Sequence, residues 1–257
     1  MCERAIELSQ LQNDSPSLVL DLGCGSGLSG AAIEEAGHHW IGVDISQSML
    51  DVALKRRACG DLEDAEVLLS DMGLGMKYFR AGAFDAAISI SALQWLCVSF
   101  SSTDNPVKRL LVFFTTLFSV LRRGAKAVLQ VYPETPNQME LITQQAMRAG
   151  FFGGVVVDFP NSTKAKKFYL VLSCGVALPY QPEPLGVQGP QQSVTFTTQA
   201  KRSGRVVKRK GKEWIIKKKE QYFSRALNKM SSQLSLLTIF DWTCSYYFAA
   251  SKSLVYD

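Results

Sequence analysis

Short apolar runs alternate with longer amphipathic stretches over the first 175 residues of the chain. The runs at 18–22, 40–43, 66–71, 83–90 and 125–134 are continuous enough to predict strands buried on both faces of a sheet. Helix-favouring stretches occur at 29–36, from 46 onward, at 106–121 and at 138–149. Strands that alternate with helices are typical of an α/β fold with a parallel sheet.

Two further apolar runs, at 155–159 and 167–172, are joined by a connection too short for a crossover helix. They are therefore expected to pair as an antiparallel hairpin at the end of the sheet. Residues 1–12 have the pattern of the end of an amphipathic helix, with Ala5, Ile6 and Leu8 on or near one face. The predicted fold is of the α/β class, with a mostly parallel seven-stranded sheet that ends in this hairpin.

The first strand runs directly into three glycines, Gly23, Gly25 and Gly27, and a helix follows. Strand, glycine turn and helix in this order open a nucleotide-binding unit, because glycines let the backbone turn sharply and approach a ligand. The free N–H groups at the helix start then face that ligand. A plain strand-to-helix connection is the alternative. The spacing Gly-x-Gly-x-Gly is tighter than the Gly-x-Gly-x-x-Gly usual for dinucleotides.

Other candidate site residues follow the carboxyl ends of later strands. The second strand ends in Asp44, about 20 residues beyond the first glycine, where an acidic residue meets ribose hydroxyls in such folds. Residues 91–95 follow the fourth strand, and Tyr132 lies near the end of the fifth. Ligands of parallel α/β sheets lie beyond the carboxyl ends of the strands, so this rim is expected to face the active site. Packing at the rim is the alternative role for Trp95 and Tyr132.

Charge is distributed unevenly along the chain. The formal net charge is +5, but residues 201–225 hold eleven Lys or Arg against two Glu, so the first 200 residues carry a charge of −4. A concentrated basic segment favours a polyanionic partner, and a solvated charged face is the alternative. Trp214, Tyr222 and Phe223 lie within this segment.

Cysteine and histidine usage does not indicate a metal site. The six cysteines are scattered without a Cys-x-x-Cys pair, which fits a reducing compartment and argues against a zinc site or a disulfide framework. The two histidines, His38 and His39, are neighbours, and adjacent side chains on a strand point to opposite faces. No metal ligand set is therefore expected.

Composition divides the chain into four parts. Residues 1–175 form the folded domain, 176–200 a Pro/Gly/Gln-rich linker, 201–225 the basic segment and 226–257 an apolar segment of unassigned role. The apolar run at 234–250 is short for a membrane span and contains Asp241. No membrane association is therefore expected.

Longer strings of the sequence resemble a known family. The motifs beginning at Asp21 and Gly42 are similar to the first two motifs of class I S-adenosylmethionine-dependent methyltransferases. Together with the basic segment, four stretches resemble the eukaryotic 18S rRNA (guanine-N7)-methyltransferase family, the Williams–Beuren-region methyltransferase, over residues 1 to about 225. These stretches are 20–30 (LDLGCGSGLSG), 88–97 (ISISALQWLC), 128–134 (VLQVYPE) and 157–170 (VDFPNSTKAKKFYL).

The resemblance implies S-adenosylmethionine-dependent N7-methylation of one guanine in 18S rRNA during ribosome biogenesis. It further implies work on pre-40S particles in the nucleus, in nucleolus or nucleoplasm, with the cytoplasm as a further compartment. A small zinc-binding activator subunit is the implied partner, and in the family it adds a strand to the exposed edge of the sheet. The candidate edge strand here is Val67, Leu68 and Leu69, since an apolar edge strand is a liability until it is paired. The basic segment would bind RNA phosphates and carry nuclear-import signals.

The resemblance also assigns roles to residues. Glycine-loop residues and Asp44 would hold the methionine and ribose parts of the cofactor, and Asp71 with Met72 would take the adenine. A turn-forming role is the alternative for Asp71, and core filling is the alternative for Met49. The cofactor-binding set is Asp21, Gly23, Gly25, Gly27, Asp44, Ile45, Met49, Asp71 and Met72. The residues expected to position the substrate guanine, with no general base among them, are Ser91, Gln94, Trp95 and Tyr132.

The two ends of the chain depart from the family pattern. Family members begin with a further stretch that contributes to the cofactor pocket, whereas this chain is expected to start inside the helix that follows. The family's tail stays basic, whereas this one becomes apolar after Arg225. A non-catalytic pre-40S assembly factor with a methyltransferase fold is therefore the alternative function. A small-molecule methyltransferase is disfavoured by the basic segment.

Overall fold

The structure is a computed structural model that describes residues 1–11, 14–63, 65–98, 105–162, 164–175 and 183–186. The basic segment 201–225, the apolar segment 226–257 and all of the linker 176–200 except 183–186 lie outside the described residues. Within the described part, no helix is long and apolar enough to cross a membrane. The five cysteines in that part of the chain are free thiols.

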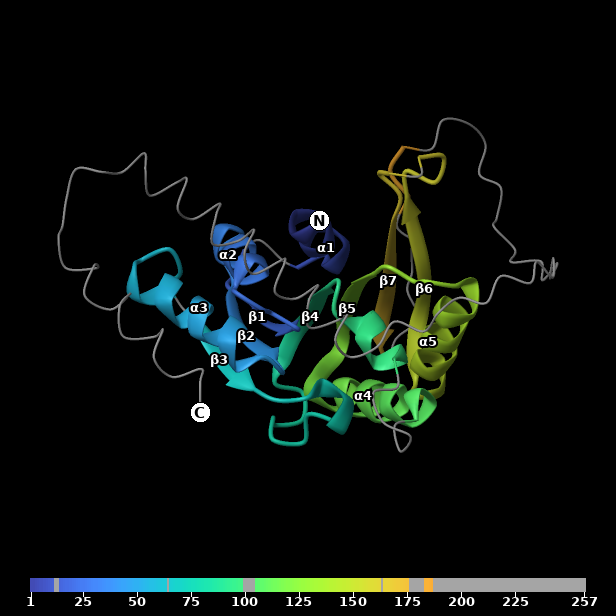
Figure 1. Cartoon of the computed structure of the whole chain (residues 1–257), viewed down its shortest axis with the longest axis horizontal. Coiled ribbons are helices and arrows are strands. Elements are labelled where there is room, and N and C mark those ends of the chain that lie inside the picture. The colour runs from blue at the N-terminus through green and yellow to red at the C-terminus, as the bar shows by residue number, and fades with distance from the viewer. Residues whose placement is uncertain (12–13, 64, 99–104, 163, 176–182, 187–257) are drawn as a thin grey trace, which may run out of the picture. The chain divides into compact units, whose positions relative to one another are not determined.

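Helices and strands alternate along the chain, as the apolar runs predict (Figure 1). Two 3-10 helices, η1 and η2, follow the third and fourth strands. The elements in order are α1 (Cys2–Ser9), β1 (Leu18–Leu22), α2 (Leu28–Glu35), β2 (His39–Asp44), α3 (Gln47–Ala58), β3 (Glu66–Leu69), η1 (Met72–Leu74), β4 (Phe84–Ile90), η2 (Leu93–Cys97), α4 (Pro106–Val120), β5 (Leu121–Val131), α5 (Pro136–Arg148), β6 (Phe151–Asp158) and β7 (Lys167–Cys174).

The seven strands form one sheet in the order β3-β2-β1-β4-β5-β7-β6. The first five strands pair in parallel, whereas β7 is antiparallel to both β5 and β6. The predicted α/β class, the mostly parallel seven-stranded sheet and the terminal antiparallel hairpin are thereby confirmed. Among the described residues, β3 pairs only with β2 and lies at one edge of the sheet, and β6 lies at the other.

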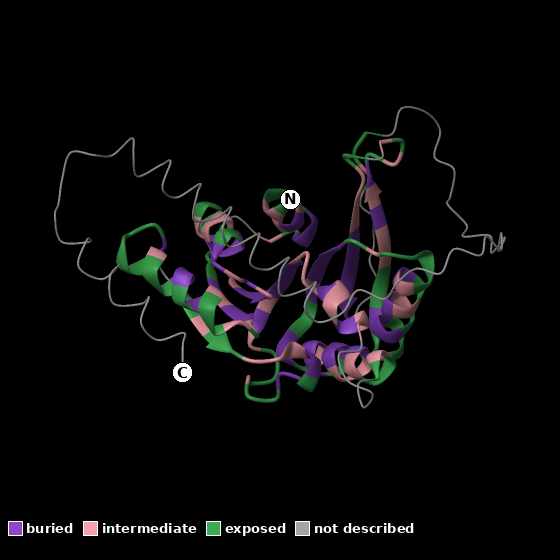
Figure 2. Ribbon diagram, in the orientation of Figure 1, coloured by how far each residue is buried: buried purple, intermediate pink, exposed green. Residues whose placement is uncertain are grey.

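Alternate residues of the central strands pack on opposite faces of the sheet. Val19, on one face, joins the apolar cluster formed with α1, α2 and α3, whereas Leu20, on the other, joins the cluster formed with α4 and α5. Figure 2 shows the buried residues concentrated in the strands and on the inner sides of the helices. Helices on both faces explain why the strands are continuous apolar runs.

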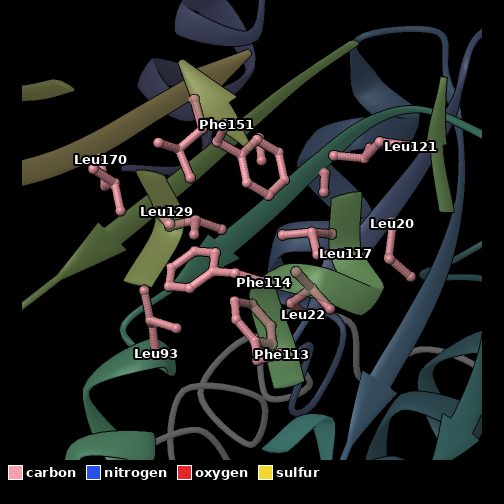
Figure 3. Close-up of a cluster of buried hydrophobic side chains, with 14 of the residues drawn as sticks. Leu20, Leu22, Leu93, Phe113, Phe114, Leu117, Leu121, Leu129, Phe151 and Leu170 are labelled. Atoms are coloured by element: carbon pink, nitrogen blue, oxygen red, sulfur yellow. The ribbon is translucent and has the colours of Figure 1, made fainter. Parts of the chain in front are cut away.

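Helix α4 supplies most of the helical part of the larger core. Phe113, Phe114 and Leu117 are fully buried and face strand residues such as Leu22 and Leu129 (Figure 3). The rings of Phe113 and Phe114 meet edge to face with centroids 5.0 Å apart. Because β5 follows α4 directly, the packing of α4 in the core sets the position at which β5 begins.

Several predicted boundaries were wrong by a few residues. The third strand was expected to reach Asp71, but β3 ends at Leu69, because the Asp71 side chain accepts a hydrogen bond from Gly73 N and starts η1. The fifth strand begins at Leu121 rather than at residue 125, because Leu121 pairs with Phe84 ahead of a bulge. The sixth strand begins at Phe151 rather than at residue 155. Helix α5 begins at Pro136, after the N-cap Thr135.

The contact between α2 and β2 leaves no room for a side chain at Gly30. A Cβ built there would lie 2.2 Å from the Trp40 ring, which is buried and whose Nε1 donates to Glu34 Oε1 at 2.7 Å. Gly30 therefore lets α2, the helix that follows the glycine loop, lie directly on the indole.

We expect Gly30→Ala to lower the free energy of unfolding by about 1–3 kcal/mol, because the added methyl overpacks a fixed ring. The matched control is Gly154→Ala in β6, where a Cβ would meet nothing within 4 Å. The control is expected to keep its stability or gain up to about 1 kcal/mol, because glycine weakens a strand. Urea unfolding of both variants measures the difference, and equal midpoints would contradict the packing argument.

Candidate functional site

The residues predicted for the site follow the carboxyl ends of neighbouring parallel strands. The glycine loop follows β1, Asp44 ends β2, Asp71 comes two residues after β3, Ser91 follows β4 and Tyr132 follows β5. These strands are adjacent in the sheet and run in the same direction, so their carboxyl ends lie along one edge of the fold.

The glycine loop approaches the end of β4 more closely than any side chain would allow. Gly23 has φ +76°, and a Cβ built on it would lie 2.3 Å from Ala92 Cβ. Its N–H donates to Val43 O at 2.7 Å, and Cys24 N donates to the same oxygen at 3.2 Å. The loop is thereby held to β2 and packed against the turn that carries Ser91.

Asp44 connects the end of β2 to the glycine loop. Its Oδ2 accepts from Gly25 N at 3.1 Å and its Oδ1 accepts from Ser46 N at 2.8 Å, and the side chain is half-buried. Met49 Cε lies 3.2 Å from a Cβ built at Gly25, so Met49 flanks the loop. Ile45, next to Asp44, is 57% exposed at the same end of the sheet. This group of predicted residues is thus brought together.

Asp21 is fully buried at the end of β1 and has an oxygen without a partner. Its Oδ2 accepts from Ser29 Oγ at 2.5 Å, while Oδ1 has no hydrogen bond. Burial raises the pKa of Asp21 to about 7, the hydrogen bond from Ser29 opposes this rise, and the negative charge of Asp44 adds to it. An unsatisfied buried carboxylate oxygen is costly unless a ligand donor reaches it.

Asp71 makes more contacts than the sequence suggests. Besides the bond from Gly73 N at 2.8 Å, its two oxygens lie 2.9 and 2.8 Å from Arg109 Nη2. Arg109 comes from the first turns of α4, 38 residues away, and no local signal marks it. Met72, the neighbour of Asp71, is half-buried in η1 and packs against the larger core. Asp71 therefore has the turn-forming role and also forms an ion pair with Arg109.

Ser91 and Gln94 form a small polar network at the end of β4. Ser91 has φ +58°, a conformation that is strained for a side-chain-bearing residue. Its Oγ donates to Gln130 Oε1 at 2.6 Å, and Gln94 Nε2 donates to Ser91 O at 2.7 Å. Gln130 is fully buried in β5 and is a residue that sequence reasoning missed. Gln94 Oε1 is buried and has no partner.

The two aromatic candidates stand apart from this network. Trp95 is half-buried in η2, one residue beyond Gln94. Tyr132 is 41% exposed, its hydroxyl lies 3.3 Å from Met1 Sδ, and Lys167 Nζ lies 5.5 Å from its ring centroid. The contacts of the described residues therefore connect Tyr132 to the β6–β7 hairpin.

The described part of the chain holds no group of three or more His, Cys, Asp or Glu side chains that could bind a metal ion. His38 is buried, and its Nδ1 accepts a hydrogen bond from Ser17 N at 3.3 Å. Desolvation by burial lowers the pKa of His38. This histidine helps fix the turn between α2 and β2, at the end of the sheet opposite the glycine loop.

Comparison with solved structures agrees with the fold. A methyltransferase from Pyrococcus furiosus superposes with a TM-score of 0.51 at 12% identity, over 68% of this chain and 83% of that one. A phosphoethanolamine N-methyltransferase from Haemonchus contortus, solved with S-adenosylhomocysteine, gives 0.52 at 17% identity, over 67% of this chain and 52% of that one. At these identities the likeness concerns the fold alone, the class I methyltransferase fold.

Sequence relatives are much closer. A family model described as a methyltransferase domain matches residues 19–111. The 18S rRNA (guanine-N(7))-methyltransferase of Mus musculus is 52% identical over 229 residues, which cover 86% of this chain and 78% of that protein. The 18S rRNA (guanine(1575)-N(7))-methyltransferase of Saccharomyces cerevisiae is 47% identical over 86% of this chain and 79% of that protein. The chain belongs to the 18S rRNA (guanine-N7)-methyltransferase family.

Proposed function

We propose that this chain transfers the methyl group of S-adenosylmethionine to N7 of a guanine in 18S rRNA. The single observation that carries the proposal is the 52% identity to a mouse enzyme of that name over 86% of the chain. A glycine loop, Asp44 and a strained serine turn at adjacent strand ends add a site of the kind such a reaction needs.

The residues at the end of β1 and β2 fit the proposed cofactor. Asp21 offers a buried oxygen with no partner, which suits a cationic N–H donor such as the ammonium of a methionine group. A Cβ on Gly23 would clash with Ala92, and a Cβ on Gly25 would crowd Met49. The glycine loop therefore offers bare backbone that a cofactor can approach closely. Asp44 has carboxylate oxygens with further acceptor capacity for ribose hydroxyls. S-adenosylmethionine, when bound, supplies a methyl group on a positively charged sulfur.

Asp71 and Met72 are the proposed adenine contacts. Arg109 fixes the Asp71 carboxylate through both oxygens, so Asp71 would meet an amino group with its remaining acceptor positions. Arg109 is then a positioning residue, because it acts through Asp71. Met49 would lie beside the cofactor through its contact with Gly25.

The chemistry at guanine N7 asks for placement rather than proton transfer. N7 carries a lone pair in the ring plane and no proton, so attack on a methyl group needs no general base. The chain's contribution is to hold N7 and the methyl carbon in line and to exclude other arrangements of these two atoms. Gln94 Oε1, buried and unpartnered, is the acceptor we propose for the guanine ring N–H or its 2-amino group. Ser91 positions this network through Gln130, and Trp95 and Tyr132 are the proposed stacking surfaces.

The edge strand β3 is the proposed site for an activator subunit. Leu68 is 38% exposed and Leu69 is 51% exposed on a strand that, within the described part of the chain, pairs on one side only. Exposed apolar side chains on an open edge favour addition of a strand from a partner. A small zinc-binding subunit, work in the nucleus and RNA binding by the segment 201–225 complete the proposal.

We expect Asp44→Ala to weaken S-adenosylmethionine binding by about 10- to 100-fold, the effect of losing hydrogen bonds to a charged group. The control, Asp51→Ala, removes an exposed carboxylate from α3 that is bonded only by Gln47. Calorimetric titration measures both. Equal affinities of Asp44→Ala and the wild type would contradict the site. If Asp44→Ala abolishes rRNA methylation but still binds pre-40S particles, the catalytic role and the assembly role of the chain are separate.

The raised pKa of Asp21 predicts a pH-dependent stability. Because the folded state holds the Asp21 proton more tightly than the unfolded chain, the contribution of Asp21 to the free energy of unfolding falls as pH rises from about 4 to about 7. Asp21→Asn removes this contribution, so its stability should decline less over that range, and Asp51→Asn should decline like the wild type. Urea unfolding at several pH values between these limits checks the slopes. Parallel profiles for wild type and Asp21→Asn would contradict the assignment.

We expect Leu69→Lys to reduce association with the activator subunit, because a charge replaces an apolar contact on the open edge of β3. Phe152→Lys on β6 is the control, since Phe152 is an apolar residue of similar exposure, 48%, on the strand at the opposite edge of the sheet. Co-expression followed by size-exclusion chromatography measures the bound fraction. An equal loss in both variants, or in neither, would count against the edge as the interface.

A further inference from the structure

The turn of the β6–β7 hairpin lies at the same end of the sheet as the candidate site. Val131, the last residue of β5, pairs with Phe168, and Lys167 pairs with Asp158. One position earlier in β5, Gln130 pairs with Tyr169, and its side chain accepts the hydrogen bond from Ser91. The residues between Asp158 and Lys167 therefore project from the sheet just beyond the network at the end of β4. Figure 1 shows this turn at the top of the two long strands β6 and β7.

Positive charge on this turn is not compensated. Lys164, Lys166 and Lys167 occur within four residues, and no acidic residue occurs between 159 and 174. The nearest acid in sequence, Asp158, is 2% exposed and is paired with Arg4, with Arg4 Nε 3.1 Å from its Oδ2. Among the described residues, none of the three lysines forms an ion pair with a carboxylate. An unpaired cluster of this kind attracts an anion.

Aromatic rings lie beside these charges. Lys167 Nζ is 5.5 Å from the Tyr132 ring centroid, and Lys166 Nζ is 5.1 Å from that of Phe168. Phe159 is 42% exposed and has φ +51°, and this backbone is fixed because Phe159 N donates to Leu185 O at 2.7 Å. Cations interleaved with exposed aromatic rings suit a nucleic-acid strand, whose phosphates meet the charges and whose bases stack on the rings.

The three lysines have different roles. Lys167 Nζ lies 3.3–3.5 Å from the backbone oxygens of Lys164, Ala165 and Lys166, so it closes the turn on itself. Lys164 is exposed. Within the described residues its ammonium forms no hydrogen bond, and the ammonium of Lys166 makes only the ring contact. Lys164 and Lys166 are therefore the two ammonium groups available to a ligand.

We propose that the hairpin patch, which comprises Tyr132, Phe159, Lys164, Lys166 and Lys167, binds the RNA strand that flanks the target guanine. Lys164 and Lys166 bind its phosphates, Phe159 stacks on one of its bases, and Tyr132 keeps the stacking role proposed above for the target guanine. The patch holds the strand while the network around Ser91 receives the guanine. The identity of the strand as 18S rRNA rests on the proposed function.

The test compares two double variants of the full chain with the activator subunit. Lys164→Ala/Lys166→Ala removes the proposed phosphate contacts. Lys55→Ala/Arg148→Ala removes the same charge from exposed positions in the last turns of α3 and α5, away from the site. The probe is a short single-stranded RNA with one guanine, and its affinity is measured over a range of salt concentrations. Losing two phosphate contacts is expected to reduce the slope of log affinity against log salt by about 1.4.

The proposal predicts this smaller slope for the hairpin variant alone, a raised KM for RNA, an unchanged kcat and an unchanged affinity for S-adenosylmethionine. Lys164→Arg/Lys166→Arg should restore the wild-type slope, because arginine also binds phosphate. A wild-type slope in the hairpin variant, or the same reduction in the control, would overturn it. A cofactor affinity that falls in parallel would also overturn it, because the patch would then act through the cofactor site. If the slopes behave as expected and the wild type methylates no RNA, the patch stands and the proposed function fails.

Discussion

Where β1 passes into α2, the backbone of two glycines lies directly against side chains of neighbouring elements, and the rest of the site depends on that close approach. Gly23 lies against Ala92 at the end of β4, and Gly30 lies against the indole of Trp40 on β2. A side chain at Gly23 would push the glycine loop away from the end of β4, and one at Gly30 would push α2 away from β2. Because the loop also binds Val43 O and Asp44, these contacts position the residues proposed to hold the cofactor.

Placement of this kind suits a reaction that needs no proton transfer. A lone pair attacking a methyl group requires alignment and a pocket of fixed polarity, and the polar side chains at the strand ends are held in place by hydrogen bonds to their neighbours. Gln130 holds Ser91, Ser91 holds Gln94, and Arg109 holds Asp71. Two of the three buried side-chain oxygens that have no hydrogen-bond partner within the described residues, those of Asp21 and Gln94, lie at the proposed cofactor side and substrate side respectively. We propose that a bound ligand supplies the missing donor at each of these two positions.

The sequence predicted those parts of the candidate site that are formed within a single short segment of the chain. The glycine spacing, the acid at the end of β2 and the hairpin closure are encoded within a few residues, and the sheet order confirms the α/β class. The supporting residues Gln130 and Arg109 were not predictable in this way. Gln130 meets Ser91 only through the register of β4 and β5, and Arg109 meets Asp71 only because α4 packs over η1. The end of β3 was misjudged because Asp71 forms a side-chain cap that competes with the strand.

The most direct test of the central claim is to locate the methyl group on the product. The chain, with its activator subunit, is incubated with 18S rRNA and S-adenosylmethionine that carries a labelled methyl group. The RNA is then cleaved by reduction and aniline treatment, which breaks the strand at N7-methylguanosine. The account predicts label at one guanine and cleavage at that guanine. Label on another atom or base, or cofactor binding without any label in the RNA, would contradict it.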